Sequence, residues 1–225
     1  ALPIYSGIGK ESALAIAKDG ANIMIADIKE NKDTIKEIEA LGVKAAFIAC
    51  DVSSPAAVKE AIQATVKSFG SLDIALNNAG IGDEGLTHEK SIDQWLKVIN
   101  INLSGVFYCM KYEIEQMLKQ KNGGSIVNIS SILGQVGTEG AAAYVAAKHG
   151  VVGLTQTAAI EYGTKNIRIN AIGPGYIETP LLQKMSADEK HALEQMHAMK
   201  RLGRPEEVAK AFAWLASDEI GRAHV

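Results

Sequence analysis

A tyrosine and a lysine four positions apart, Tyr144 and Lys148, have the spacing in this chain that says most about chemistry. On a helix this spacing puts the phenol and the ammonium on one face, about one turn apart. An ordinary tyrosine has a pKa of about 10, and lowering it to about 7 takes roughly 4 kcal/mol of added phenolate stabilisation. A unit positive charge about 4 Å away supplies roughly that much at an effective dielectric constant of about 20. We therefore expect Lys148 to lower the pKa of Tyr144 and make it a general acid/base near neutral pH.

Two more polar residues extend this pair. Ser131 follows a β-rich run that indicates a buried strand opening into a loop, so its hydroxyl can donate to a substrate carbonyl oxygen. Asn102 interrupts a helical apolar pattern with an amide. Each feature alone also has a structural explanation: a solvated helix face for the Tyr-Lys spacing, and a helix kink satisfied by its own side chain for Asn102. The four residues together favour a catalytic group.

A glycine-rich turn near the start of the chain predicts a site for dinucleotide phosphates. The run Ser6-Gly7-Ile8-Gly9 precedes a helical pattern, whose free N–H groups and dipole would hold a pyrophosphate at close approach. Asp27 ends the next strand, where a carboxylate can accept hydrogen bonds from the adenosine ribose hydroxyls and repel a 2′-phosphate. NAD is therefore expected rather than NADP. Asp27 has the alternative role of capping the next helix, and the nearby cation Lys29 can soften the preference.

With these residues in view, the chain resembles the short-chain dehydrogenase/reductase family from residue 6 to about residue 219. The motifs follow the family's order and nearly its spacing: Gly7-Ile8-Gly9, Asp27, Asp51-Val52, Asn77-Asn78-Ala79-Gly80, Asn102, Ser131, Tyr144 with Lys148, and Pro174-Gly175 with Thr179. The resemblance implies that Tyr144 is the general acid/base and that Ser131 orients and polarises the reacting oxygen. It also implies that Lys148 lowers the tyrosine pKa and holds the nicotinamide ribose, while Asn102 anchors a water that relays protons to Lys148.

The resemblance extends to the cofactor site. Asp51 and Val52 are expected to border the adenine, and Ile177 and Thr179 the nicotinamide carboxamide. The complete set expected to bind the cofactor is Ser6, Gly7, Ile8, Gly9, Asp27, Ile28, Asp51, Val52, Asn78, Ala79, Gly80, Tyr144, Lys148, Pro174, Gly175, Ile177 and Thr179.

Length and composition are those of one soluble domain. At 225 residues with 47% hydrophobic content the chain can build one sizeable core, and no stretch marks a linker. A formal net charge of -3 offers no basic surface for nucleic acid, and no apolar stretch approaches the ~18 residues of a membrane span. Cys50 and Cys109 lie in apolar runs, which favours buried thiols in a reducing compartment, and the histidines lack the spacing of a helical metal site. We expect a cytoplasmic protein with no metal site and with no nucleic-acid or membrane partner.

Apolar strand-like runs alternate with longer helical patterns along the chain. Strands are expected at 22–27, 45–50, 72–77, 125–130 and 167–172, and helices at 9–19, 29–41, 55–69, 92–121, 141–162, 180–199 and 205–217. Near-continuous apolar strands joined by helices indicate an α/β fold. We expect a doubly wound, Rossmann-type parallel sheet in a three-layer αβα single domain, 1–225. Ligands bind such sheets at the carboxyl ends of the strands, where Asp27, Ser131 and Pro174 fall.

Both ends of the chain depart from the family pattern. A Thr-Gly pair is expected where Leu2 and Pro3 stand, and Pro3 removes a donor and a flexible glycine from the phosphate loop. After Glu219 the sequence does not continue into the loop and last strand of that pattern. One hypothesis is that segments are missing near 5/6 and 219/220, with 1–4 a remnant of the first strand.

The substrate is the part of the function that the sequence defines least. Family resemblance places a small substrate lid around 176–204, rich in Leu, Met and Ala, a composition that also suits ordinary helix packing. Gln135, Val136, Thr138 and Glu139 are expected to line the mouth of the site, although Glu139 suits a solvated loop equally well. No arginine pair stands where a carboxylate or phosphate would need one, which favours a neutral secondary alcohol or ketone.

Three functions remain open from the sequence. The first is an NAD(H)-dependent oxidoreductase that interconverts a neutral secondary alcohol, small or alicyclic, and its ketone. The second is a 3-oxoacyl-thioester (acyl-carrier-protein) reductase, which a preference for NADPH would favour and Asp27 argues against. The third is a non-catalytic, nucleotide-sensing protein of the same fold, which the four filled catalytic positions disfavour.

The chain is also expected to assemble with copies of itself. The segments 103–121 and 145–162 carry apolar residues on more than one helix face: Val106, Phe107, Met110, Ile114, Met117, Val151, Val152, Leu154, Ala158 and Ala159. One contact with a sheet does not use them all, and the family resemblance implies a homotetramer built by these helices.

Overall fold

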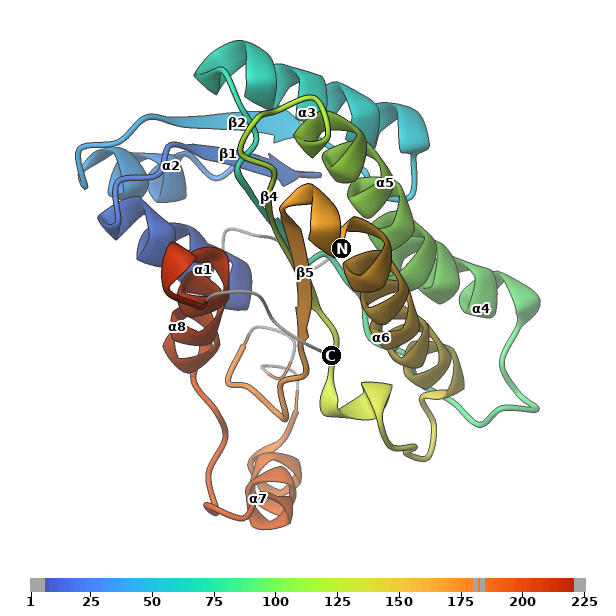
Figure 1. Ribbon diagram of the computed structural model, residues 1–225. Helices are drawn as coiled ribbons and strands as arrows, with labels where there is room; N and C mark the ends of the chain where they lie inside the picture. Colours follow the sequence, from blue (N-terminus) through green and yellow to red (C-terminus); the bar gives the residue numbers. More distant parts are fainter. Residues whose placement is uncertain (1–6, 180–181, 183–184, 221–225) are drawn as a thin grey trace.

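Parallel strands form the middle layer of the fold (Figure 1). The computed structural model describes residues 7–179, 182 and 185–220. Its strands are β1 (Ile23–Asp27), β2 (Ala45–Ala49), β3 (Ile74–Asn77), β4 (Gly124–Ile129) and β5 (Ile167–Ile172). They pair in parallel in the orders β1-β2 and β3-β4-β5, and each overlaps one of the expected strands.

Helices cover both faces of the strands, which gives the expected three-layer αβα arrangement (Figure 1). They are α1 (Gly7–Lys18), α2 (Lys32–Glu39), α3 (Pro55–Phe69), α4 (Ile92–Ile99), α5 (Gly105–Met117), α6 (Ala142–Tyr162), α7 (Ala187–Met196) and α8 (Pro205–Ala216). α1 and α8 pack together on one face, while α3, α5 and α6 cover the other. α7 lies beyond the carboxyl ends of β4 and β5, at the bottom of Figure 1.

Local sequence accounts for where two of these helices begin. Ser91 and Gln94 form a reciprocal capping box at the start of α4. Ser186 and Glu189 form another at the start of α7, so this helix begins at 187 and not at the expected 180. Residues 180, 181, 183 and 184 lie outside the described part of the chain.

The single helix expected over 92–121 is interrupted. α4 gives way to a π-helical turn over Asn100–Ser104 before α5 begins. The side-chain amide of Asn102 in this turn forms hydrogen bonds with the backbone of Ile81. Gly105 lets the turn approach a neighbouring loop, because a Cβ there would lie 2.9 Å from Val52 Cγ2. Asn102 therefore makes a tertiary contact and does not satisfy its own helix.

One hydrophobic cluster fills the space between the strands and α5 and α6, and others lie against α1 and α8. Several residues expected to serve assembly are buried inside this one chain: Val106, Met110, Ile114, Met117, Val151 and Ala158. That part of the argument for assembly is wrong, because α3 and the strands already cover these side chains. Phe107 on α5 and Ile160 on α6 remain exposed, at 47% and 74% of their surface.

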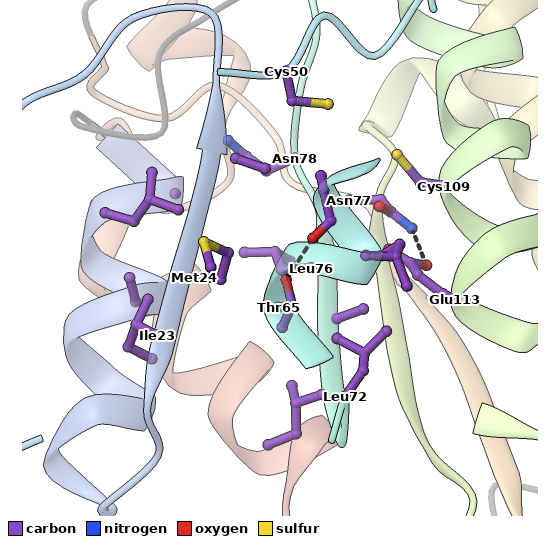
Figure 2. Close-up of a pocket in the computed structure, with 18 of the residues that line it drawn as sticks. Ile23, Met24, Cys50, Thr65, Leu72, Leu76, Asn77, Asn78, Cys109 and Glu113 are labelled. Carbon is purple, nitrogen blue, oxygen red and sulfur yellow. Dashed lines mark hydrogen bonds between the residues drawn. The ribbon is translucent and has the colours of Figure 1, made fainter. Parts of the chain in front are cut away.

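A cavity of about 450 Å³ lies between β1 and β3, the facing strands of the two groups, which do not pair with each other. Figure 2 shows Ile23 and Met24 of β1 on one side of it, and Leu76 and Asn77 of β3 on the other. The segment 1–4, expected to be a remnant of the first strand, lies outside the described residues. This cavity is lined mainly by core side chains of strands and helices and does not contain the expected catalytic residues.

Candidate active site

A second cavity, of about 240 Å³, contains Tyr144, Ser131 and Lys148 in its wall, and we call it the cleft. Five segments meet around it: the start of α1, the loop after β3, the end of β4 with the turn that follows, the start of α6, and the loop after β5. Three of these follow parallel strands, so the cleft lies at the carboxyl edge of the sheet. The position is the one that the sequence predicts.

Tyr144 and Ser131 interact in the cleft. The turn after β4 holds Ser131, whose hydroxyl accepts a hydrogen bond from the Leu133 N–H at 3.1 Å. Burial raises the pKa of the Tyr144 phenol, and a side-chain hydrogen bond with Ser131 lowers it by a smaller amount. The expected lowering of this pKa is therefore wrong for this structure, because desolvation of the phenolate outweighs the contact that stabilises it.

Lys148 stands over the face of the Tyr144 ring, with its Nζ 5.5 Å from the ring centre. The ammonium donates a hydrogen bond to the Ile129 carbonyl at 2.7 Å and is almost entirely buried. Burial lowers the pKa of Lys148 to about 8, because the charged form loses its solvation. The four-residue spacing brings the two side chains together as predicted, but the cation gives its hydrogen bond to the end of β4.

Asn102 joins the group from the π-helical turn. Its Oδ1 accepts a hydrogen bond from the Ile81 N–H and its Nδ2 donates to the Ile81 carbonyl, both at 2.8 Å. Gly80 lies between Asn102 and Lys148: a Cβ at this position would be 3.5 Å from Asn102 Oδ1 and 4.0 Å from Lys148 Nζ. The fold thus brings Ser131, Tyr144 and Lys148 into the wall of the cleft, whereas Asn102 is buried behind Gly80 and does not line it.

The residues expected to bind the cofactor divide into two groups. Those in the wall of the cleft are Gly7, Ile8, Asn78, Gly80, Tyr144, Lys148, Pro174, Gly175, Ile177 and Thr179. Those outside this wall are Gly9, Asp27, Ile28, Asp51, Val52 and Ala79. Ser6 lies outside the described residues. Gly7 begins α1 with a φ of 59°, a conformation that favours glycine, and the first turn of α1 has no acidic residue, which suits a phosphate.

Asp27 and Asp51 stand at the carboxyl ends of β1 and β2, beyond the cleft. Asp27 is buried, and its Oδ1 accepts a hydrogen bond from the Lys29 N–H at 3.4 Å. Asp51 accepts hydrogen bonds from the N–H and the hydroxyl of Ser53, and these bonds lower its pKa. Both carboxylates lie at the edge of the sheet where a bound dinucleotide would extend.

The side chains that narrow the cleft differ from those expected. Leu133 and Ala141 line it, and so do Ile132 and Tyr176. The residues expected at its mouth, which do not line it, are Gln135, Val136, Thr138 and Glu139. The short turn Ile132–Gly134 leads the chain out to the surface, where Val136 is exposed. The wall near Tyr144 is therefore more apolar than the sequence indicates.

A buried polar network crosses the fold beside the larger cavity, and sequence reasoning missed it. Asn77 donates hydrogen bonds to Glu113 Oε2 at 3.0 Å (Figure 2) and to Asn128 Oδ1 at 2.9 Å, and Asn128 donates to the Thr155 hydroxyl. Burial raises the pKa of Glu113 to about 7, although the bond from Asn77 opposes the rise. The signal available was a carboxylate one position before Ile114, inside the apolar stripe of α5.

Asp83 is a second residue that sequence reasoning missed. It lies in the wall of the cleft and forms an ion pair with Lys90. No motif marks either residue, because both belong to an irregular loop between β3 and α4.

In the described parts of the chain, no group of three or more His, Cys, Asp or Glu side chains is arranged to hold a metal ion. Among the helices of those parts, none combines the length and the apolar character that crossing a membrane requires.

Known proteins resemble this chain over nearly its whole length. A family model described as enoyl-(acyl carrier protein) reductase matches residues 4–223. The cyclohexanol dehydrogenase of Acinetobacter sp. (strain SE19) is 46% identical over 217 residues, which cover 95% of this chain and 85% of that protein. The 3-oxoacyl-(acyl-carrier-protein) reductase FabG of Thermotoga maritima is 41% identical over 216 residues, covering 95% and 87%. The solved structure of ElxO with NADP bound has a TM-score of 0.90 at 35% identity and covers 100% of this chain and 92% of that one.

Proposed function

The chain belongs to the short-chain dehydrogenase/reductase family and is an oxidoreductase acting on CH–OH groups, and from this we propose its reaction. The reaction is the interconversion of a neutral secondary alcohol and its ketone with NAD(H) as the cofactor. The observation that carries the proposal is the convergence of Tyr144, Ser131 and Lys148 in one cleft with the start of α1 and the loop after β5.

The residues of the cleft fit a nicotinamide dinucleotide. At one end, the free N–H groups of the first turn of α1 would hold the pyrophosphate. At the other, Pro174, Ile177 and Thr179 would hold the nicotinamide. Asp27 would accept hydrogen bonds from the adenosine ribose, which favours NAD over NADP. When bound, the cofactor supplies the hydride donor for reduction and the hydride acceptor for oxidation.

Tyr144 moves the proton in the proposed reaction. Burial raises the pKa of its phenol, so the phenol is protonated at neutral pH and can donate its proton to the ketone oxygen during reduction. Oxidation needs the phenolate, which takes the proton of the alcohol. The Ser131 hydroxyl, bonded to Tyr144, orients and polarises the same substrate oxygen.

Lys148 and Asn102 assist these two residues. The Lys148 ammonium, over the tyrosine ring, would hold the nicotinamide ribose. Its pKa of about 8 suits the release of a proton at mildly alkaline pH. Asn102, whose orientation the Ile81 backbone fixes, would anchor the water that relays this proton.

The cleft favours an uncharged substrate. Its wall includes the apolar side chains of Leu133 and Ala141. Lys148 is buried and Asp83 is paired with Lys90, so neither presents a solvated charge to a substrate carboxylate. The relative named cyclohexanol dehydrogenase supports an alicyclic alcohol. The segment 176–204, which contains α7, would cover the substrate as a small lid on a single domain, 1–225.

The second candidate function is reduction of a 3-oxoacyl thioester on an acyl-carrier protein. The 41% identical relative with that name favours it, and so does the neighbouring structure with NADP bound. Asp27 argues against it, because a carboxylate at the end of β1 repels the 2′-phosphate of NADP. The alternative of another class, a non-catalytic nucleotide sensor, would bind the cofactor without turnover.

We also propose that the enzyme is a homotetramer in the cytoplasm. Phe107 and Ile160 leave exposed apolar surface on α5 and α6, the helices expected to meet between copies. Cys50 and Cys109 are unpaired, and burial raises the pKa of each thiol, to about 11 for Cys50. Two inert, unpaired thiols suit a reducing compartment.

Turnover of the wild-type protein is the direct test. The protein mixed with NAD and a panel of cyclic and linear secondary alcohols should generate the near-ultraviolet absorbance of reduced nicotinamide. Tyr144→Phe removes only the oxygen that transfers the proton, and it should lower kcat by about 10²–10⁴-fold. Binding of NADH, followed by its fluorescence, should stay close to that of the wild type.

Two outcomes would count against the proposal. Full activity in Tyr144→Phe would contradict the assigned acid/base. Turnover of 3-oxoacyl thioesters with NADPH, and of no simple alcohol with NAD, would establish the second function instead.

A further inference from the structure

Asp83 and Lys90 form an ion pair inside the protein, next to the helix that carries Tyr144. Each side chain is 3% exposed, and Lys90 Nζ lies 2.5 Å from Asp83 Oδ1. Lys90 also donates a hydrogen bond to the Glu84 carbonyl at 2.7 Å. Desolvation offsets most of the attraction in a buried ion pair, so net stability is a weak explanation for this one.

The second carboxylate oxygen of Asp83 caps helix α6. Oδ2 accepts hydrogen bonds from the N–H groups of Ala143, at 2.8 Å, and Tyr144, at 3.3 Å. These are the second and third residues of α6, whose own N-cap residue, Ala141, makes no side-chain cap. A helix usually satisfies these N–H groups with the side chain of its N-cap residue. Here the cap comes from a residue 60 positions earlier in the chain.

The loop that carries Asp83 is itself held in place. Asn102 bonds both polar groups of the Ile81 backbone, two residues before Asp83. A continuous set of contacts therefore runs from the π-helical turn through this loop to the first turn of α6. The last residue bonded is Tyr144, whose side chain lies in the cleft.

We propose that Asp83, oriented by Lys90, is a positioning residue for Tyr144: it fixes the first turn of α6 so that the phenol stands beside Ser131. The inference rests on the proposed function, because it concerns the placement of the general acid/base. A carboxylate at a helix N-terminus is favourable, and Lys90 balances its charge, so the cap adds no net charge beside Tyr144. Without the cap the first turn frays, and a misplacement of about 1 Å lowers a rate about a hundredfold.

The experiment compares Asp83→Ala with Ser54→Ala. Ser54 is the matched control, because its hydroxyl caps α3, a helix without site residues, through the Ala57 N–H. Both variants are assayed at a temperature where they are folded and bind NADH with wild-type stoichiometry. Asp83→Ala should lower kcat about a hundredfold with little change in the KM of the alcohol, and Ser54→Ala should leave kcat unchanged.

A double variant tests whether the acceptor at position 83 is what matters. Asp83→Asn combined with Lys90→Gln keeps an oxygen for the two N–H groups and replaces the ion pair by an amide–amide hydrogen bond. This variant should recover most of the kcat lost in Asp83→Ala. A loss as large as that of Asp83→Ala would overturn the proposal.

Amide hydrogen exchange separates this inference from the proposed function. The amides of Ala143 and Tyr144 should exchange faster in Asp83→Ala than in the wild type, whether or not an alcohol is turned over. Absence of wild-type turnover would refute the proposed function, while faster exchange confined to the start of α6 would still support the cap. Unchanged exchange there, or a loss of kcat no greater than that of Ser54→Ala, would overturn the inference.

Discussion

The Tyr144 phenol keeps its proton at neutral pH, although a lysine stands one helical turn away. The reason lies in the hydrogen bonds and the burial of the two side chains. Lys148 gives its hydrogen bond to the Ile129 carbonyl and stands over the ring, while the phenol is buried and bonded to Ser131. Desolvation then dominates and raises the Tyr144 pKa. A protonated phenol is the form that donates to a ketone, so in the proposed reaction this arrangement would favour reduction at neutral pH.

Asp27 is the residue that should decide between NAD and NADP. Asp27→Asn keeps the size of the side chain and its ability to bond a ribose hydroxyl, but it removes the charge that repels a 2′-phosphate. The ratio of kcat/KM with NADP to that with NAD should rise about tenfold or more, since repulsion of 1.4 kcal/mol corresponds to a factor of ~10. Initial rates with both cofactors and one alcohol measure this ratio.

Glu30→Gln is the matched control for Asp27→Asn. Glu30 lies three residues farther along and is exposed, and its replacement removes the same charge without touching the end of β1. It should leave the ratio unchanged. A wild-type protein that already prefers NADP, or an Asp27→Asn variant with an unchanged ratio, would show that this carboxylate does not select the cofactor.

Helix α5 carries a carboxylic acid on its buried face. The stability that the packing of this helix provides should therefore depend on pH. Glu113 is 5% exposed, and its hydrogen bond comes from Asn77 at the end of β3. Burial raises the pKa of this carboxyl group because it penalises the charged form, and the hydrogen bond from Asn77 opposes the rise only in part. α5 and β3 are thus joined by a hydrogen bond to a buried carboxyl group, and burial outweighs the stabilisation that this bond gives to the charged form.

Glu113→Gln should therefore flatten the pH dependence of stability. The pKa of Glu113 rises from 4.5 to about 7 in the folded protein. Its stabilising contribution is fully present below about pH 4.5 and is lost as the pH rises through about 7. The amide keeps an acceptor for Asn77 and cannot ionise, so the variant should be more stable than the wild type above pH 7, by up to roughly 3 kcal/mol. Urea denaturation between pH 5 and 8 measures the difference.

Glu115→Gln on the same helix provides the comparison. Glu115 is exposed, and its pKa is lowered by the hydrogen bond from Lys111. Its replacement should not make the protein more stable at high pH than at low pH. If Glu113→Gln and Glu115→Gln change the free energy of unfolding in the same way across this range, burial of Glu113 has no energetic consequence.

Across the whole fold, the cleft and the exposed apolar surface lie in different places. The cleft is formed at the carboxyl edge of the strands, whereas the exposed residues of α5 and α6 lie on the outer side of the helical layer. Most apolar residues of these two helices pack inside the chain. Assembly through this layer therefore rests on a few exposed side chains, of which Ile160 is 74% exposed.

Ile160→Glu should dissociate the proposed tetramer. Burying an isoleucine contributes about 1.5–3 kcal/mol, and a glutamate in the same interface adds a desolvation cost, so dissociation should increase by more than tenfold. Sedimentation velocity at micromolar concentration measures the species present. Ile92→Glu is the control, because Ile92 is 72% exposed but lies on α4, outside the proposed contact. A wild-type protein that sediments as a monomer would refute the tetramer.

Much of the fold follows from patterns that are local along the chain. The apolar runs correctly place all five described strands, because a strand buried on both faces needs consecutive apolar side chains. The Tyr144–Lys148 contact follows for a similar reason, since residues four apart share a helix face whatever surrounds the helix. The break of the predicted 92–121 helix does not follow, because the π-helical turn depends on the Ile81 backbone meeting Asn102.

The residue types that we propose for the chemistry, their order along the chain, and the edge of the sheet to which they belong were thus readable from the amino-acid sequence. Three features could not be read from it: the raised pKa of Tyr144, the capping of α6 by the distant residue Asp83, and the burial of the acid Glu113. Each of these depends on groups between 13 and 61 positions apart meeting in a space that water cannot enter. Periodicity reports which side of an element a residue occupies, but desolvation and long-range hydrogen bonds exist only once the elements have packed together.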